Sequence, residues 1–275
     1  MKDQFQIRRD KLRNLIKNNG LSGILTTSFV NVTYLTGFTG DDSFLLVTKE
    51  GDTLLSDFRY AEQIERECPN LTAYIRPVEE SPARATKKLL MGVTPKRLGV
   101  EGDSMTLTQR DAFAAALDDW ELVTTSGLVE RLRMVKDRNE VELMRKAGVI
   151  AARAFECLQA GLRAEQTEIQ LKNQMDHAMK EFGAERTSFN TIVAVGQQAS
   201  LCHAVPGNRC VSDGELLLID WGAVFKGYMS DNTRTLITAQ KPSNKLRKLY
   251  DIVLNAHLHA AAADFPYLPG VGIVQ

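Results

Sequence analysis

The feature that most constrains this chain is a stretch in which an apolar run, an aspartate, a two-residue turn and a second aspartate follow one another. Residues 216–235 read LLLIDWGAVFKGYMSDNTRT. The apolar run predicts a strand, and the pair Lys226-Gly227 favours a two-residue hairpin loop. Because Asp220 directly follows four apolar residues, we expect it and its partner Asp231 to be half-buried carboxylates.

A two-residue loop also determines which residues face each other across the hairpin. Asp220 would lie opposite Thr233, and Gly222 opposite Asp231. The two carboxylates then share one face as diagonal neighbours roughly 7 Å apart, close enough to hold cations between them. Their repulsion favours a positive charge at that place, which a divalent metal would supply. The alternative is a solvated Asp231 at the end of a turn and an Asp220 that caps a neighbour.

Composition excludes several classes of function. The chain has 275 residues with 34 basic and 34 acidic side chains, so its net charge predicts neither a nucleic-acid partner nor an anionic membrane surface. No apolar run approaches the ~18 residues of a membrane span, and the charged start is not typical of a secretory signal. We therefore expect a cytoplasmic protein with reduced thiols. The cysteines form no CxxC pair and predict no zinc site; they are Cys68, Cys157, Cys202 and Cys210.

Short apolar runs alternate with helical patterns in the first part of the chain, which favours an α/β domain with a mixed sheet. A boundary is predicted near residue 125, in a small polar stretch, and long helical patterns follow it. The predicted strands cover 23–28, 43–49, 52–57, 71–75, 97–101, 187–196, 215–225 and 228–238. The predicted helices cover 60–68, 83–91, 108–117, 129–158, 167–183 and 244–263, with an amphipathic helix before Gly20 and a final loop over 266–275.

Several linked motifs resemble one family. The segments SFNTIVAVGQQASLCHAVPGN and DGELLLIDWGAVFKGYMSDNTRTL closely resemble the pita-bread metallopeptidases, in the aminopeptidase P and Xaa-Pro dipeptidase (prolidase) branch. The segment NVTYLTGFTGDDSFLLVTKEGDTLLSDFRYAEQ resembles the creatinase-type N-terminal domain of that branch. The resemblance implies an α/β (α+β) protein, with a creatinase-type domain over 1–125 and a pita-bread catalytic domain over 126–275.

The resemblance also implies a function and a cofactor. Members of the branch hydrolyse the bond that precedes proline in dipeptides or peptide N-termini, with two divalent metal ions, manganese first and cobalt or zinc as alternatives. Asp220 and Asp231 match the two aspartate ligands of the family, and His203 matches a histidine that contacts the substrate. An imidazole there can donate to a substrate carbonyl or a developing oxyanion. The alternative for His203 is an ordinary loop histidine.

Three neighbours complete the predicted site. The hydroxyl of Thr233 would orient the Asp220 carboxylate, although a β-branched residue also simply suits a strand. Phe189 and Asn190 would support the pocket wall from their strand. Trp221 alternates away from the aspartates and is expected to pack in the core.

The chain departs from the family pattern after Asp231. One further His ligand and two further Glu ligands are expected there, but no glutamate follows Glu215, and His257 and His259 stand two residues apart on a predicted helix. We therefore expect an incomplete, C-terminally truncated pita-bread domain. The leading hypothesis is an Xaa-Pro metallopeptidase by descent that acts on proline-containing peptides and, as the resemblance implies, forms a homodimer. The alternatives are a non-catalytic binding or oligomerisation module and, less favoured because both aspartates are present, a metal-free creatinase-like hydrolase.

Overall fold

The chain divides into two compact units, which are described separately. The computed structural model describes residues 3–212, 214–238 and 242–263. The units are Met1–Val135 and Lys136–Gln275. The division lies after Val135 rather than after residue 125, because the strand Glu121–Thr125 pairs with the sheet of the first unit and the helix Leu128–Met134 packs against its helices.

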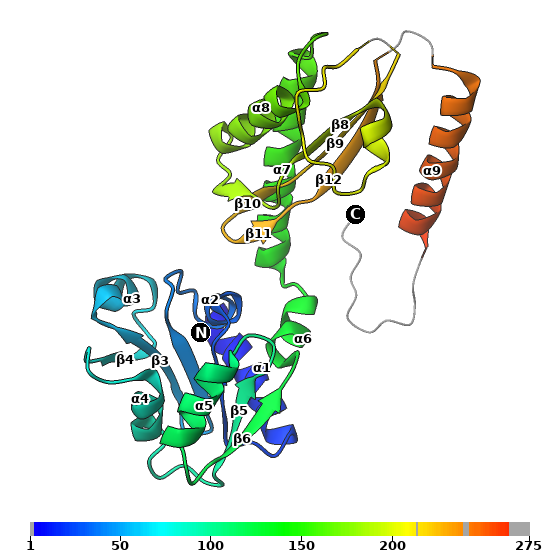
Figure 1. The fold of residues 1–275 in the computed structure, drawn as a ribbon. Coiled ribbons are helices and arrows are strands. Elements are labelled where there is room, and N and C mark those ends of the chain that lie inside the picture. The colour runs from blue at the N-terminus through cyan, green and yellow to red at the C-terminus, as the bar shows by residue number, and fades with distance from the viewer. Residues whose placement is uncertain (1–2, 213, 239–241, 264–275) are drawn as a thin grey trace. The chain divides into compact units, whose positions relative to one another are not determined.

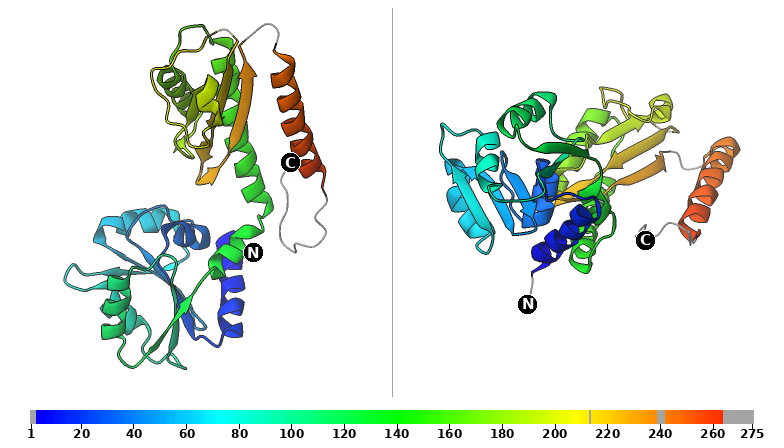
Figure 2. Two further views of the ribbon diagram at one scale, coloured as in Figure 1. Left: turned by 45° about the vertical axis from the view of Figure 1, so that its right-hand side comes forward. Right: turned by 90° about the horizontal axis from the view of Figure 1, so that it is seen from below.

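The first unit is a mixed sheet between two layers of helices (Figures 1 and 2). In its described residues the sheet has six strands in the order β4-β3-β2-β1-β5-β6. Because β1 pairs antiparallel with β2 and parallel with β5, the sheet is mixed, as the sequence predicts. The strands are β1 (Gly23–Thr26), β2 (Phe44–Thr48), β3 (Asp52–Asp57), β4 (Thr72–Arg76), β5 (Arg97–Glu101) and β6 (Glu121–Thr125). The helices are α1 (Gln4–Asn18), α2 (Phe29–Thr36), α3 (Ala61–Glu67), α4 (Pro82–Leu89), α5 (Leu107–Ala116) and α6 (Leu128–Met134), with the 3-10 turn η1 (Phe58–Tyr60).

Both faces of this sheet are covered. Consecutive residues of β1 point into different cores: Ile24 packs with side chains of α1, α2 and α6, whereas Leu25 packs with those of α4 and α5. Every residue of β1 is buried. The central strand therefore has the burial that a continuous apolar run favours.

Sequence patterns did not predict α2 or β6. The helix α2 is rich in β-branched and aromatic residues, which have low helix propensity. Its start is stabilised by a carboxylate far away in the sequence, since Glu101 accepts hydrogen bonds from the backbone N–H groups of Thr27 and Ser28 at 2.6 and 2.8 Å. A negative charge at a helix N-terminus is favourable, but only the folded chain brings it there.

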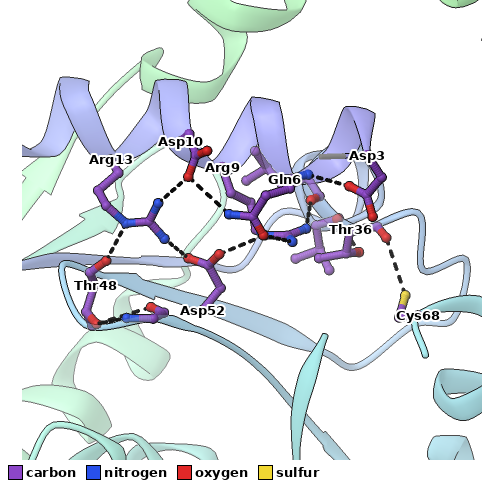
Figure 3. Close-up of polar contacts among 12 residues, drawn as sticks. Asp3, Gln6, Arg9, Asp10, Arg13, Thr36, Thr48, Asp52 and Cys68 are labelled. Carbon is purple, nitrogen blue, oxygen red and sulfur yellow. Dashed lines mark hydrogen bonds and ion pairs between the residues drawn. The ribbon is translucent and has the colours of Figure 1, made fainter. Parts of the chain in front are cut away.

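A buried ion-pair network holds α1 against β2 and β3 (Figure 3). Asp52 accepts from Arg9 at 2.9 Å and from Arg13 at 2.5 Å. Arg9 also donates to the carbonyl of Leu35 at 2.8 Å, and Arg13 to that of Thr48 at 2.8 Å. The side chains of Arg9 and Asp52 are only 5% and 7% exposed, so this charge pair is compensated inside the unit.

The second unit places two long helices against two small antiparallel sheets (Figures 1 and 2). In the described residues its strands form two three-stranded sheets, ordered β12-β9-β8 and β11-β10-β7. Its strands are β7 (Arg186–Thr187), β8 (Ile192–Val195), β9 (Leu216–Trp221), β10 (Ala223–Phe225), β11 (Tyr228–Met229) and β12 (Asn232–Ile237). Its helices are α7 (Arg138–Ala160), α8 (Glu168–Glu181) and α9 (Asn244–Ala262), with the 3-10 turn η2 (Gly196–Ser200).

Four predicted elements of this region are interrupted. The strands expected over 215–225 and 228–238 are each divided, into β9 and β10 and into β11 and β12, and the two halves of each belong to different sheets. The helix expected over 129–158 is two helices, α6 and α7, because a capping box starts a new helix: Asp137 accepts from the Glu140 backbone at 3.0 Å, and Glu140 accepts from that of Asp137 at 2.9 Å. The strand expected over 187–196 is divided into β7 and β8. The last predicted helix is confirmed as α9, and the loop expected over 266–275 lies outside the described residues.

The structure bears on two features of the composition, the apolar segments and the cysteines. Within the ranges that it describes, no helix combines the length and the apolar character needed to cross a membrane. The four cysteines are free, and Cys68 is buried beneath α2 and α3, where burial raises the pKa of its thiol to about 11. That thiol therefore stays protonated near neutral pH.

Candidate functional site

The hairpin that carries the two aspartates has the predicted register. Phe225 pairs with Tyr228, and Asp220 pairs with Thr233, without an inserted residue between these pairs. Both loop residues have positive φ, 49° at Lys226 and 76° at Gly227. These angles suit a type I′ turn, whose twist matches that of the strands on either side.

Asp220 and Asp231 interact as like charges on one face of this hairpin. Asp220 is half-buried at the end of β9, whereas Asp231 is exposed, so the expectation that both are half-buried is wrong for Asp231. Asp231 precedes the strand β12 rather than lying within it, which leaves its side chain to solvent. Burial raises the pKa of Asp220, the hydrogen bond from Thr233 lowers it, and the negative charge of Asp231 raises it.

Thr233 contacts Asp220 as the pairing predicts. Its hydroxyl donates to Oδ1 of Asp220 at 3.0 Å. One carboxylate oxygen is thereby oriented, and the other is left for a further partner. Asp220, Asp231 and Thr233 are thus the three predicted site residues that the fold brings together.

Gly222 lets the strands come close enough for this arrangement. A Cβ atom at Gly222 would lie 1.9 Å from the carbonyl oxygen of Ser230 and 2.1 Å from the hydroxyl oxygen of Ser188. Ser188 donates to that same carbonyl at 2.9 Å, and its N–H donates to the carbonyl of Gly222 at 2.9 Å. Ser188 therefore links the turn before β8 to the residue that precedes Asp231.

Three side chains fasten the hairpin to α7. Trp221 is 1% exposed, as the alternation predicts, and its indole N–H donates to the carbonyl of Ala151 at 2.9 Å. The hydroxyl of Tyr228 donates to Glu140 at 3.0 Å, and that of Ser230 to the carbonyl of Ala147 at 3.2 Å. The partners are separated by 70 residues or more, and no local pattern in the sequence indicates them.

His203 lies in an exposed turn after η2. No hydrogen bond or ion pair joins its imidazole to Asp220, Asp231 or Thr233 in the described structure. The side chain is therefore accessible to a ligand from solvent, and the geometry of the protein alone assigns it no partner.

Phe189 and Asn190 lie in the bend between β7 and β8, not in a strand. Phe189 is half-buried and Asn190 is exposed. The strand expected there is interrupted because the register changes: Thr187 pairs with Ala223 and Ile192 with Asp220, so the four residues between them lie opposite only two. Their predicted place in the pocket wall stays a prediction.

The aspartate pair meets part of what a divalent metal requires. Carboxylate oxygens are suitable ligands for manganese. Burial first, and the charge of Asp231 after it, raise the pKa of Asp220, and a bound cation would stabilise its ionised form against both. Within residues 3–212, 214–238 and 242–263, however, no three His, Cys, Asp or Glu side chains are grouped as a metal ion would need. His257 and His259 both lie exposed on α9. The described residues thus provide a carboxylate pair but not a complete metal site.

Comparisons with known proteins match both units. Residues 142–272 match the sequence model of Metallopeptidase family M24, and residues 8–135 match that of the Creatinase/Prolidase N-terminal domain. The chain is 34% identical over 261 residues to the uncharacterized peptidase YqhT of Bacillus subtilis, covering 95% of this chain and 73% of that protein. It is 27% identical over 260 residues to the Xaa-Pro dipeptidase of Pyrococcus furiosus, covering 94% and 72%. Among solved structures, an Xaa-Pro dipeptidase from Bacillus anthracis matches with a TM-score of 0.88 at 32% identity, covering 94% of this chain and 72% of that one.

Proposed function

Because the chain belongs to Metallopeptidase family M24, with a Creatinase/Prolidase N-terminal domain before the peptidase domain, we propose that it is an Xaa-Pro peptidase. Its substrates would be proline-containing dipeptides or peptide N-termini, hydrolysed at the bond that precedes proline. The observation that carries the proposal is the register of the hairpin, which brings Asp220 and Asp231 to one face. The similarity to Xaa-Pro dipeptidases supports the substrate class.

Each site residue has a proposed role. Asp220 and Asp231 would hold divalent metal ions, manganese first, and Thr233 would keep the Asp220 carboxylate oriented through its 3.0 Å hydrogen bond. When bound, such ions supply a water activated as a nucleophile. His203 would donate a hydrogen bond to the substrate carbonyl, as its exposure permits. The further ligands that a two-metal site needs are not among the described residues.

Metal content and peptide hydrolysis together test this proposal. Purified protein is reconstituted with manganese, desalted and examined by elemental analysis, then assayed on alanyl-proline and on a longer peptide that begins Ala-Pro. Two manganese ions per chain, the stoichiometry of a two-metal hydrolase, together with hydrolysis of either peptide would support the proposal. Asp220→Asn and Asp231→Asn should each weaken the affinity for manganese. Changing a residue that only orients a metal ligand costs about 10–100-fold in affinity, and the loss of a ligand itself should cost more. Asp251→Asn, an exposed aspartate on α9, is the matched control and should retain the metal.

A second candidate is a binding or oligomerisation module without catalysis. It is favoured by one observation, that the described residues group no third metal ligand with the aspartates. Protein that retains almost no manganese and leaves both peptides intact would support this candidate and contradict the peptidase proposal. The manganese, the homodimer and the cytoplasmic location stay predictions, the first of which the same experiment tests.

A further inference from the structure

A buried carboxylate stands between the two ends of the loop that carries His203. Glu168, in the first turn of α8, is 3% exposed. Its Oε1 accepts from the backbone N–H of Val195 at 2.8 Å, and its Oε2 accepts from that of Gly207 at 2.9 Å. Val195 ends β8 and Gly207 follows the exposed turn, so one side chain joins the chain segments on both sides of residues 196–206.

The outgoing end of the loop is also tied to the start of α8 by backbone hydrogen bonds. The N–H of Ile169 donates to the carbonyl of Gly207 at 3.0 Å, and the N–H of Glu168 donates to that of Arg209 at 3.0 Å. These bonds secure only one end. At the other end, Val195 pairs with Leu217 in the sheet, and the contact from the Glu168 carboxylate to Val195 joins this end to the outgoing one.

The stability of α8 does not by itself explain a carboxylate at this position. The helix already has a complete capping box, in which Thr167 and Gln170 exchange hydrogen bonds at 3.2 and 2.9 Å. Burying a carboxylate is costly unless hydrogen bonds and a favourable field compensate it. Glu168 has both: two backbone N–H groups donate to it, and it lies at the helix N-terminus. The two donors flank the His203 loop, one on each side.

A second contact constrains the loop where it leaves β8. Gly196 has a φ of 59°, and a Cβ atom there would lie 2.7 Å from the carboxylate of Glu215 and 2.8 Å from the guanidinium of Arg209. Those two side chains form an ion pair at 2.8 Å. Gly196, the first residue of the loop, therefore packs against Arg209 and Glu215, which follow the loop in the sequence.

We propose that Glu168 is a positioning residue for His203. Its carboxylate closes residues 196–206 into a loop of defined shape and so determines where the imidazole is presented. The value of that position for catalysis rests on the proposed peptidase function, whereas the closure of the loop does not.

Two variants and one control test the closure in the full chain. Glu168→Ala removes both acceptors, and Glu168→Gln keeps one acceptor oxygen in a side chain of the same shape. Glu181→Gln changes an exposed glutamate at the other end of the same helix and is the control. The measurements are amide hydrogen exchange at Val195, Gly207 and the loop, and the imidazole NMR signal of His203, assigned with His203→Gln.

In Glu168→Ala we expect amide exchange at Val195 and Gly207 to become about 10–100-fold faster, because each amide loses a hydrogen bond to a charged group. The His203 signal should move and broaden, while amides of the α7 core keep their protection. Glu168→Gln should expose one of the two amides and leave the other protected. Because that variant keeps the shape of the side chain, it decides the question if the alanine variant does not fold.

The proposal is overturned if both amides and the His203 signal are unchanged in a folded Glu168 variant. A structural role alone would lower the melting temperature without moving the His203 signal, and that result also overturns it. If the wild type hydrolyses alanyl-proline, Glu168→Gln should lower kcat about tenfold or more at unchanged metal content. If the wild type does not, the peptidase proposal fails, and the exchange and NMR results still decide the role of Glu168.

Discussion

The strands β1 and β9 are both apolar runs, yet they are buried differently. Every residue of β1 is buried, because helices cover both faces of its sheet. In β9 burial alternates: Leu217, Ile219 and Trp221 are buried against α7 and α8, whereas Leu216, Leu218 and Asp220 are only half-buried on the other face. An apolar run therefore predicts a strand without predicting that both faces are covered, and here the less covered face is the one that carries the aspartates.

The two units also differ in how their carboxylates are paired. In the first unit, Asp52 lies between Arg9 and Arg13, so opposite charges compensate each other inside the protein. In the second unit, Asp220 and Asp231 are like charges: burial is the largest cause that raises the pKa of Asp220, and the negative charge of Asp231 raises it further. Charge pairs of the first kind stabilise a fold, whereas a like-charge pair at a half-open face is typical of a site that binds something.

The largest expected effect comes from breaking the compensated network. Asp52→Ala leaves two arginines without their shared carboxylate, and we expect the first unit to lose about 3–5 kcal/mol of unfolding free energy. Urea unfolding followed by Trp120 fluorescence in a Trp221→Phe background measures it. Asp119→Ala, which removes a half-exposed partner of Lys96, is the control and should leave the midpoint unchanged. Equal effects of the two variants would contradict the contrast drawn between buried and exposed pairs.

Neighbouring leucines of β9 test the difference between its faces. Leu217 is 0% exposed and Leu218 is half-buried, so Leu217→Ala should cost about 2–5 kcal/mol and Leu218→Ala about 1 kcal/mol. Fluorescence of Trp221 in a Trp120→Phe background reports the unfolding of the second unit. A cost for Leu218→Ala as large as that for Leu217→Ala would show that the second face of β9 is covered in solution.

Asp57 supplies a pH-dependent test in the first unit. Hydrogen bonds from Arg59, the largest cause, and the nearby charges of Arg59 and Arg76 hold the pKa of Asp57 below its ordinary value of 3.8. A lowered pKa contributes stability above 3.8 that is lost as pH falls through the folded-state value. Asp57→Asn should therefore cost about 1–2 kcal/mol at pH 7, less than a fully buried pair because Arg59 is half-exposed.

The difference between wild type and Asp57→Asn should shrink as the pH is lowered below 3.8. Urea titrations at pH 7, 5 and 3 measure it, with fluorescence of Trp120 as the probe. A constant difference across this range would mean that Asp57 stabilises the unit by packing and not by its charge.

The smallest expected effect concerns the hydrogen bond to Asp220. Thr233→Val removes the donor at 3.0 Å and should cost about 0.5–1 kcal/mol of unfolding free energy, whereas Thr233→Ser keeps the hydroxyl and should cost less. Unfolding followed by Trp221 fluorescence compares the two. A larger cost for Thr233→Ser than for Thr233→Val would assign the role of Thr233 to its β-branched shape rather than to its hydroxyl.

The resemblance of the sequence motifs predicted the family and the pita-bread lineage of the second unit, and the family comparison confirms both. Sequence patterns predicted the mixed sheet of the first unit, which the strand pairing confirms. They missed α2, because a helix of β-branched and aromatic residues starts at a carboxylate on β5. They also joined α6 to α7, although Asp137 and Glu140 have the spacing of a capping box and could have revealed the break.

By itself, the sequence determined the pairing of Asp220 with Thr233, since a two-residue loop and a side-chain period of two leave a single register. Only the tertiary structure decided that Glu168 meets both ends of the His203 loop and that α7 holds the hairpin through Trp221 and Ser230. The physical reason is distance along the chain. Local steric rules act between neighbours, whereas a buried carboxylate or indole finds its hydrogen-bond partner only when the whole core has packed.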